Sequence, residues 1–316
     1  MIPVGKPLLP PLEYMTRKVS EIINSSQVSN GKYVRLLEEK VQEIHKVKHA
    51  IAFANCTTGL ILTVKNAFPV WEKWGVWKPV AIPNYTWKST NMALRFNCII
   101  SEYVDVDPDT FLIDKIPEHV YGVLAVDTFG NRCDLKIDKP VIYDAAHSLG
   151  VPGVGNRGVA EVFSMSPMKT FTACEGGIVV TNDDTLAEKL REDRRFFGRM
   201  PEINAVIGLY NLNRLDEVRA EKKNTFNYYK RELEPLGFKF QKINESSYNE
   251  ISVVHENAKG IIKEIQDKIE IRSRYEPFVR ALACSRISEH LFDNSFILPS
   301  WIGVPKEEVV RIIKEA

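Results

Sequence analysis

Lys169 is the side chain whose surroundings could support the most chemistry. It lies in the stretch Phe163–Gly177, among apolar and small residues and between two expected strands. Removal of water lowers the pKa of a lysine and makes its amine a nucleophile toward carbonyl groups. Most lysines are solvated surface residues, so Lys169 indicates a function only together with its neighbours. Ser164, in the same stretch, could donate a hydrogen bond to a phosphate.

A carboxylate and an imidazole follow another apolar strand. Val141–Tyr143 runs directly into Asp144, and His147 comes three residues later. An ionised carboxylate away from water needs a partner, because an unpaired buried charge is costly. A protonated pyridinium nitrogen is one such partner, and His147 could reach the same ligand. An acid that only caps a loop is an equally open interpretation of this motif alone.

Small and hydroxyl residues mark the start of an expected helix at Asn55–Gly59, directly after a strand. Thr57 and Thr58 lie where free backbone N–H groups and the helix dipole favour a phosphate. An ordinary N-cap would use the same residue types, and taken alone it is the more frequent case. In Pro83–Trp87, the aromatic Trp87 at a strand end could stack on a planar ring. A core aromatic is the alternative, since tryptophan is usually buried.

Two other patterns match known motifs but lack their context. Gly153–Gly158 reads GxGxxG, but a strand-like segment follows it, whereas a dinucleotide site needs a helix there. A glycine-rich hairpin is the better interpretation. His45 and His49 have the spacing of neighbours on a helix, but no third ligand or general-base glutamate accompanies them. We therefore expect no metal site.

The elements that must position these residues alternate between strand and helix patterns. Short apolar runs predict strands, and spacings of three and four predict helices. Alternation of this kind indicates an α/β fold with a mostly parallel sheet and helices on both faces, where ligands gather at the carboxyl ends of strands. We expect strands at 50–54, 79–83, 99–104, 121–126, 141–143, 159–164 and 177–181, and helices at 13–46 (broken near 25–32), 57–68, 86–96 and 185–195.

The pattern changes after about residue 200. One long, charged helical region with a possible break covers 203–233 and ends before Pro235, because proline cannot continue a helix. Strand-like stretches follow at 238–254, and helices are expected at 259–268 and 306–315. We predict a large domain at 1–220 and a smaller C-terminal domain at 221–316.

Composition excludes several classes of protein. The chain has 316 residues, 44% of them apolar, and a net charge of +1 without a concentrated basic segment, so we expect no nucleic-acid partner. No apolar run approaches the ~20 residues of a membrane helix. The five cysteines form no CxxC pair, which argues against a zinc ribbon or a disulfide framework. Reduced thiols fit a cytoplasmic protein.

The order and spacing of these clusters closely resemble the DegT/DnrJ/EryC1/StrS family of sugar aminotransferases, which depend on pyridoxal 5'-phosphate (PLP). The resemblance runs from about Ile2 to Leu233 and is weaker in the tail from Leu298. Its most specific motifs are Asp144-Ala-Ala-His147, Phe163-Ser164 through Lys169 to Glu175-Gly-Gly177, Val104-Asp-Val-Asp-Pro-Asp-Thr110 and Val126-Asp-Thr-Phe-Gly-Asn131.

The resemblance implies the PLP-dependent transferase fold of type I, which is aspartate-aminotransferase-like. That fold has a large domain with a mixed, mostly parallel sheet and a smaller α+β C-terminal domain. It also implies a role for each matching residue. Lys169 would hold PLP as a Schiff base, Asp144 would pair with the pyridine nitrogen, and His147 would contact the 3-oxygen. Thr57, Thr58 and Ser164 would hold the phosphate, and Trp87 would stack on the ring.

The implied reaction moves an amino group from glutamate, leaving 2-oxoglutarate, to a nucleotide-linked keto sugar. The motifs favour a 4-keto-6-deoxy sugar aminated at C4 over C3. Asn131, Glu175 and Arg199 would contact this substrate, and a homodimer would complete each active site. The chain is shorter than usual for the family, and it has Phe197 where the family places an Asn that reaches the partner's PLP phosphate.

Three alternatives remain at this point. A catalytically silent PLP-fold protein would bind a ligand or a partner without turnover, which Phe197 and the short chain leave open. The sugar dehydratase branch of PLP enzymes replaces the lysine with His, so Lys169 argues against it. A nicotinamide oxidoreductase would have to use the GxGxxG segment.

Overall fold

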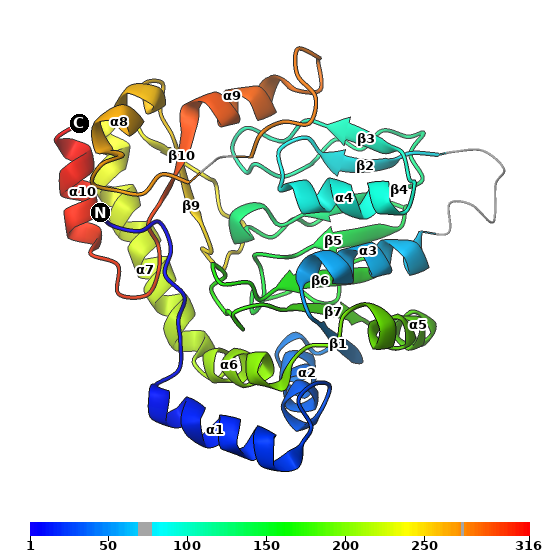
Figure 1. Ribbon diagram of the computed structural model, residues 1–316. Coiled ribbons are helices and arrows are strands. Elements are labelled where there is room, and N and C mark those ends of the chain that lie inside the picture. The colour runs from blue at the N-terminus through cyan, green and yellow to red at the C-terminus, as the bar shows by residue number, and fades with distance from the viewer. Residues whose placement is uncertain (69–77, 273–274) are drawn as a thin grey trace.

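The protein is described by a computed structural model that covers residues 1–68, 78–272 and 275–316. Its central feature is a seven-stranded sheet with the order β1-β7-β6-β5-β4-β2-β3 (Figure 1). Strand β7 pairs antiparallel with both of its neighbours, and the other pairs are parallel. The strands are β1 (His49–Phe53), β2 (Val80–Pro83), β3 (Ser101–Val104), β4 (Gly122–Val126), β5 (Val141–Asp144), β6 (Ala160–Ser164) and β7 (Gly177–Thr181).

Helices cover both faces of this sheet (Figure 1). Those on one face are α3 (Cys56–Ala67), α4 (Lys88–Phe96) and α5 (Asp184–Phe197). Those on the other are α1 (Leu12–Ser25), α2 (Lys32–His45) and α6 (Glu202–Leu212). Glu202 joins two of the latter, because its buried carboxylate accepts hydrogen bonds from the free N–H groups of Gly31, Tyr33 and Val34 at the start of α2.

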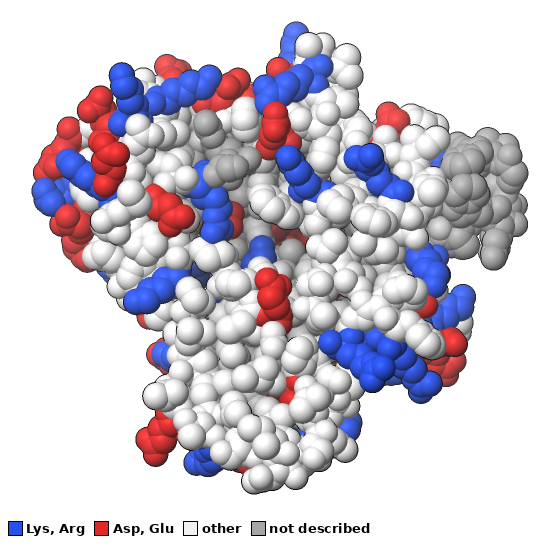
Figure 2. All heavy atoms as spheres, viewed as in Figure 1, with Lys and Arg blue, Asp and Glu red and all other residues white. Residues whose placement is uncertain are grey.

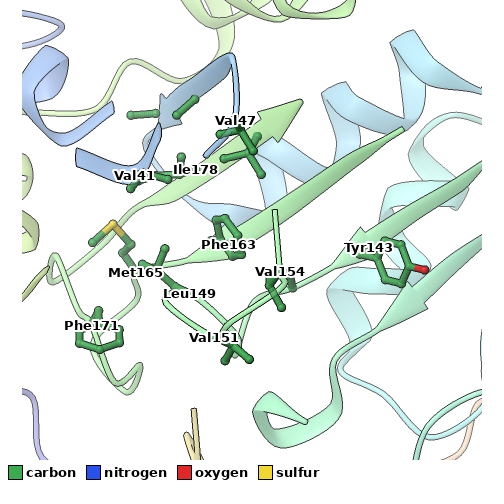
Figure 3. Close-up of a cluster of buried hydrophobic side chains, with 14 of the residues drawn as sticks. Val41, Val47, Tyr143, Leu149, Val151, Val154, Phe163, Met165, Phe171 and Ile178 are labelled. Atoms are coloured by element: carbon green, nitrogen blue, oxygen red, sulfur yellow. The ribbon is translucent and has the colours of Figure 1, made fainter. Parts of the chain in front are cut away.

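Alternate residues of each strand enter separate cores, since successive strand side chains point to opposite faces. In β7, Ile178 packs with Phe163 in one core, whereas Val179 packs with Leu60 in the other. Figure 3 shows the first of these cores, into which Val41 also points. Both faces of the sheet are therefore apolar, and this explains why the strands read as continuous hydrophobic runs.

A C-terminal unit packs around a second, three-stranded antiparallel sheet with the order β10-β9-β8. Its elements are α7 (Leu215–Leu233), the 3-10 turn Glu234–Leu236, β8 (Lys239–Phe240), β9 (Ile251–Val254), α8 (Ala258–Ile265), α9 (Arg286–Asn294), β10 (Ser295–Leu298) and α10 (Lys306–Lys314). The predicted boundary at residues 220/221 falls inside α7 and stays a prediction.

The start of the chain also belongs to this unit (Figure 1). Ile2 forms a parallel bridge with Ile269 and contacts the core of the C-terminal unit. The N–H of Val4 donates to Glu270 over 3.0 Å. A Cβ added at Gly5 would lie only 1.8 Å from the Met168 side chain, so this segment also touches the loop that carries Lys169.

The expected α/β class with a large, mostly parallel sheet and a smaller unit is confirmed. The helical region expected at 203–233 with a possible break consists of the two helices α6 and α7. Other details were wrong or missed, and neither α9 nor β10 was predicted. Gly153–Gly158 is a loop between parallel strands, so it is not a hairpin. His49 lies in β1 rather than on a helix with His45. Among the described residues, no helix combines the length and apolarity of a membrane span.

Candidate active site

A cavity of about 430 Å³ lies where several sheet strands reach their carboxyl ends. It is closed from the other side by residues of the C-terminal unit. The lining brings together most of the side chains that the sequence singled out, namely Thr57, Trp87, Asp144, His147, Ser164, Lys169 and Glu175. It also includes side chains that sequence reasoning missed, among them Phe129, Glu250, Arg272 and Tyr275.

Asp144 ends β5 with only 3% of its surface exposed. Its Oδ2 accepts a hydrogen bond of 2.7 Å from the Thr90 hydroxyl, and its Oδ1 accepts one of 3.2 Å from the N–H of Ala146. Burial raises the pKa of Asp144 in spite of these bonds. Asp144 forms no ion pair within the described part of the chain, so a positively charged ligand atom would stabilise its ionised form.

Lys169 follows β6 in a turn, where its N–H donates to the carbonyl of Ser166 over 3.0 Å. Its Nζ has no hydrogen-bond partner in the described part of the chain. Burial lowers the pKa of Lys169, although the negative charge of Glu250 acts in the opposite direction. A desolvated, unbonded amine that faces a cavity is suited to attack a carbonyl group.

His147 stacks on Phe129, with 14° between the two ring planes and 6.4 Å between their centroids. Phe129 is held in the left-handed region at φ 60°, and a Cβ at Gly130 next to it would lie 3.0 Å from the carbonyl of His147. Burial lowers the pKa of His147 well below its usual value. The imidazole is therefore neutral near pH 7 and can both donate and accept one hydrogen bond.

The start of α3 borders the same cavity. The Asn55 side chain caps the helix by accepting the N–H of Thr58 over 2.8 Å. The N–H groups of Cys56 and Thr57 have no partner among the described residues, and their positive ends suit an anion. Gly177 allows this approach, because a Cβ there would lie 2.5 Å from the backbone of Cys56.

Three of the expected site residues do not line the cavity in this single chain. Thr58 is bound through its N–H to Asn55, and Asn131 is fully buried. The Asn131 amide donates to the carbonyl of Lys242 over 2.9 Å, so it fastens the C-terminal unit to the large sheet. Arg199 is exposed and donates from Nε to the carbonyl of Arg195 over 3.1 Å. Of the remaining residues, Trp87 is 57% exposed at the cavity edge.

The cavity residues from the C-terminal unit gave no local sequence signal. Glu250 directly precedes β9, and Arg272 and Tyr275 lie between α8 and α9. Tyr275 stacks on Phe129 with 5.1 Å between ring centroids. A search for titratable residues near the starts of strands would have noted Glu250, but nothing in the sequence relates it to Lys169.

Comparison with known proteins identifies the family of this chain. The model of the DegT/DnrJ/EryC1/StrS aminotransferase family matches residues 13–315. The chain belongs to this family. A curated relative, the dTDP-4-amino-4,6-dideoxy-D-glucose transaminase of Shigella dysenteriae, is 30% identical over 265 residues, which cover 74% of this chain and 70% of the relative. The resemblance inferred from the motifs is thus confirmed.

Solved structures confirm the fold. DesI, crystallised in the presence of its TDP-sugar product, superposes with a TM-score of 0.85 at 24% identity, covering 99% of this chain and 91% of that one. The Helicobacter pylori aminotransferase PseC, involved in pseudoaminic acid biosynthesis, gives 0.83 at 22% identity, covering 99% and 98%. The E. coli GDP-4-keto-6-deoxy-D-mannose-3-dehydratase with bound hydrated PLP gives 0.84 at 18% identity, covering 99% of each chain.

As a member of this family, the protein is a PLP-dependent aminotransferase of fold type I. The chemical groups that line the cavity also fit PLP. Among the residues that the structure describes, the cavity combines a carboxylate without an ion pair at Asp144, an amine without a hydrogen-bond partner at Lys169, and unpaired N–H groups at Cys56 and Thr57. These match the ring nitrogen, the carbonyl carbon and the phosphate of PLP, one group each.

Proposed function

We propose that the enzyme transfers an amino group from glutamate to C4 of a nucleotide-linked 4-keto-6-deoxy sugar. The observation that carries the proposal is that Lys169 and Asp144 line one cavity of a family member. The curated relative supports the substrate class, because its name describes a 4-amino-4,6-dideoxy sugar linked to dTDP. An amine at C4 of that sugar favours C4 over C3.

Lys169 acts as the covalent anchor and as the proton carrier. When bound, PLP supplies an electron sink that allows an amino group to leave one carbon and join another. The Nζ of Lys169, with its lowered pKa, would move a proton from the donor carbon to the cofactor in the first half of the reaction, and from the cofactor to the sugar carbon in the second half.

Asp144 and His147 set the charge at the ring. Asp144 holds the ring nitrogen in its protonated form, and the hydroxyl of Thr90 keeps this carboxylate in place. The neutral His147, stacked on Phe129, offers one hydrogen bond to the ring oxygen without adding charge. In this proposal Thr57, Thr58 and Ser164 bind the phosphate, and Trp87 stacks on the ring.

A second copy of the chain would complete each site. Phe197 is exposed at the end of α5 and Arg199 is exposed just after it, and the surface over α1 and α6 is mostly uncharged (Figure 2). Leu12 and Ile23 of α1 are 83% and 66% exposed, which is unusual for large apolar side chains. We therefore propose a cytoplasmic homodimer in which Arg199 reaches the partner's substrate and Phe197 replaces a polar phosphate contact. Asn131 and Glu175 remain proposed substrate contacts.

The alternatives make different predictions. A sugar dehydratase of this fold is among the structural neighbours, but the Nζ of Lys169 gives this chain the amine that transamination needs. A silent PLP-binding protein would load the cofactor and never convert it to the pyridoxamine form. The loop Gly153–Gly158 leads into β6 instead of a helix, so the nicotinamide hypothesis has no supporting geometry.

Borohydride reduction of the PLP-loaded enzyme, followed by peptide mass mapping, tests the anchor. We expect the cofactor mass on Lys169 alone, and none after Lys169→Arg. The matched control is Lys222→Arg, which changes a nearby buried lysine whose Nζ is already bonded to the carbonyls of Asn249 and Ser300, and it should leave the label in place. Label on another residue in the unaltered enzyme would overturn the assignment.

Substrate identity is tested separately with glutamate and a panel of nucleotide-linked keto sugars. We expect the absorbance of bound PLP to change on adding glutamate and to recover on adding a 4-keto-6-deoxy sugar. Product NMR then locates the new amine at C4 or at C3. Recovery only with 3-keto sugars would contradict the C4 proposal, and no response to glutamate or to any other amino acid would favour the silent protein.

A further inference from the structure

The guanidinium of Arg272, in the C-terminal unit, lines the same cavity as Lys169. Nη1 of Arg272 lies 3.1 Å from Oε1 of Glu250. This is a single contact, whereas the planar guanidinium can bind a carboxylate through two parallel hydrogen bonds. The side chain of Arg272 is 31% exposed and that of Glu250 is 12% exposed, so the arginine is accessible from the cavity.

Arg272 and Glu250 lie close to the reacting centre. Both also line a second, smaller cavity of about 30 Å³ that shares Lys169 with the main one. Arg272 acts electrostatically on both Lys169 and His147, and Glu250 acts on Lys169 with the opposite sign. An anion held by Arg272 would therefore lie next to the carbon on which Lys169 acts.

We propose that Arg272 binds a carboxylate of the amino donor, and that Glu250 occupies the guanidinium until the donor arrives. This inference rests on the proposed transamination. The α-carboxylate of an amino acid is attached to the same carbon as the amine, so it has to lie close to Lys169. The phosphates of a nucleotide sugar are separated from C4 by the sugar ring, so they are expected farther from this position.

The resident Glu250 competes with the donor for the guanidinium. When a donor carboxylate binds, the Glu250 carboxylate has to give up its contact of 3.1 Å with Nη1 of Arg272. The proposal therefore predicts opposite effects on carboxylate binding for substitutions of Glu250 and Arg272, which a purely structural ion pair would not. Removing the charge of Glu250 frees Arg272 and should strengthen carboxylate binding, whereas removing the charge of Arg272 should weaken it.

The test uses the PLP-loaded enzyme and glutarate, a dicarboxylate that lacks an amine and cannot react. Calorimetry of glutarate binding should show a Kd raised roughly 10–100-fold in Arg272→Gln, as expected for one hydrogen-bonded charge pair. Glu250→Gln should lower the Kd several-fold, and Arg272→Lys should give an intermediate loss. The control is Arg280→Gln, which removes an exposed arginine paired with Glu276 over 3.1 Å.

Several outcomes would overturn the proposal. These are an unchanged glutarate Kd in Arg272→Gln, equal weakening in both Gln variants, or weakening of dTDP binding in place of glutarate binding. PLP content and urea unfolding of each variant show that the protein is folded, and Glu250→Gln keeps the test decisive if Arg272→Gln does not fold. Failure of the proposed function looks different, because the unaltered enzyme would then bind glutarate but not respond to glutamate.

Discussion

His45 should make the stability of the protein depend on pH in a way that one substitution removes. Its Nδ1–H donates to the carbonyl of Val154 over 2.7 Å, and its Nε2 accepts the N–H of Gly150 over 3.1 Å. The ring also stacks on Phe163 with 4.7 Å between centroids. Since both nitrogens are engaged in the neutral form, a second proton would break the bond from Gly150.

The direction follows from the two protonation states. Burial lowers the pKa of His45 from 6.5 to about 4. Above pH 6.5 both the folded and the unfolded chain carry a neutral ring, so the group adds no pH dependence. Between pH 6.5 and 4 only the unfolded chain takes up the proton, which stabilises the unfolded state. At pH 5 this lowers the free energy of unfolding by about 2 kcal/mol.

Urea unfolding of the PLP-loaded protein at pH 7 and pH 5 measures this effect. His45→Gln keeps an amide donor and acceptor but cannot be protonated in this range. We expect the unaltered protein to lose about 2 kcal/mol more than the variant between the two pH values. His290→Gln, which changes an exposed histidine, should behave like the unaltered protein. Equal losses in the unaltered protein and in His45→Gln would refute the reasoning.

Two other substitutions test the framework of the site. Gly177→Ala places a Cβ 2.5 Å from the backbone of Cys56, so we expect a loss of about 1–3 kcal/mol in urea unfolding and weaker PLP binding in a fluorescence titration; an unchanged PLP Kd would contradict the role given to this helix start. Arg157→Met leaves the buried carboxylates of Asp127 and Glu161, now 2.7 and 2.6 Å from the guanidinium, without a cation. Unfolding should then cost about 3–5 kcal/mol less, because a buried carboxylate is left without its partner, and a loss below about 1 kcal/mol would contradict this reasoning.

The large sheet could be predicted because its signals are local. Each inner strand is a short apolar run, and in β4 all residues from Gly122 to Val126 are buried. Parallel order places the carboxyl ends of the strands at one edge of the sheet. For this reason the sequence alone predicts that Asp144 and Ser164 share a cavity. The same pattern predicted a strand after the glycine loop at Gly153–Gly158, and β6 follows there.

The residues that close the site could not be predicted, because folding relates them only over long distances in the chain. Glu250 and Arg272 lie in short, irregular segments whose types are common on protein surfaces. For Asn131 the sequence suggested a substrate contact, because it lies in a family motif. In the structure its amide instead donates to the carbonyl of Lys242 in the C-terminal unit. The short helix α9 is followed at once by the short strand β10. Each has too few residues for the helical or the strand spacing of apolar residues to be recognised.

The bridge between Ile2 and Ile269 has a consequence for the order of events on the ribosome. Val4 and its partner Glu270 are 266 residues apart in the chain. At a synthesis rate of about 5–20 residues per second, the N-terminal segment waits on the order of tens of seconds for the segment at 269–270 that it joins. The large sheet can be completed during that interval with this segment unpaired. The C-terminal core therefore closes last, around a piece of chain that was made first, and the site beside Met168 takes its final form only then.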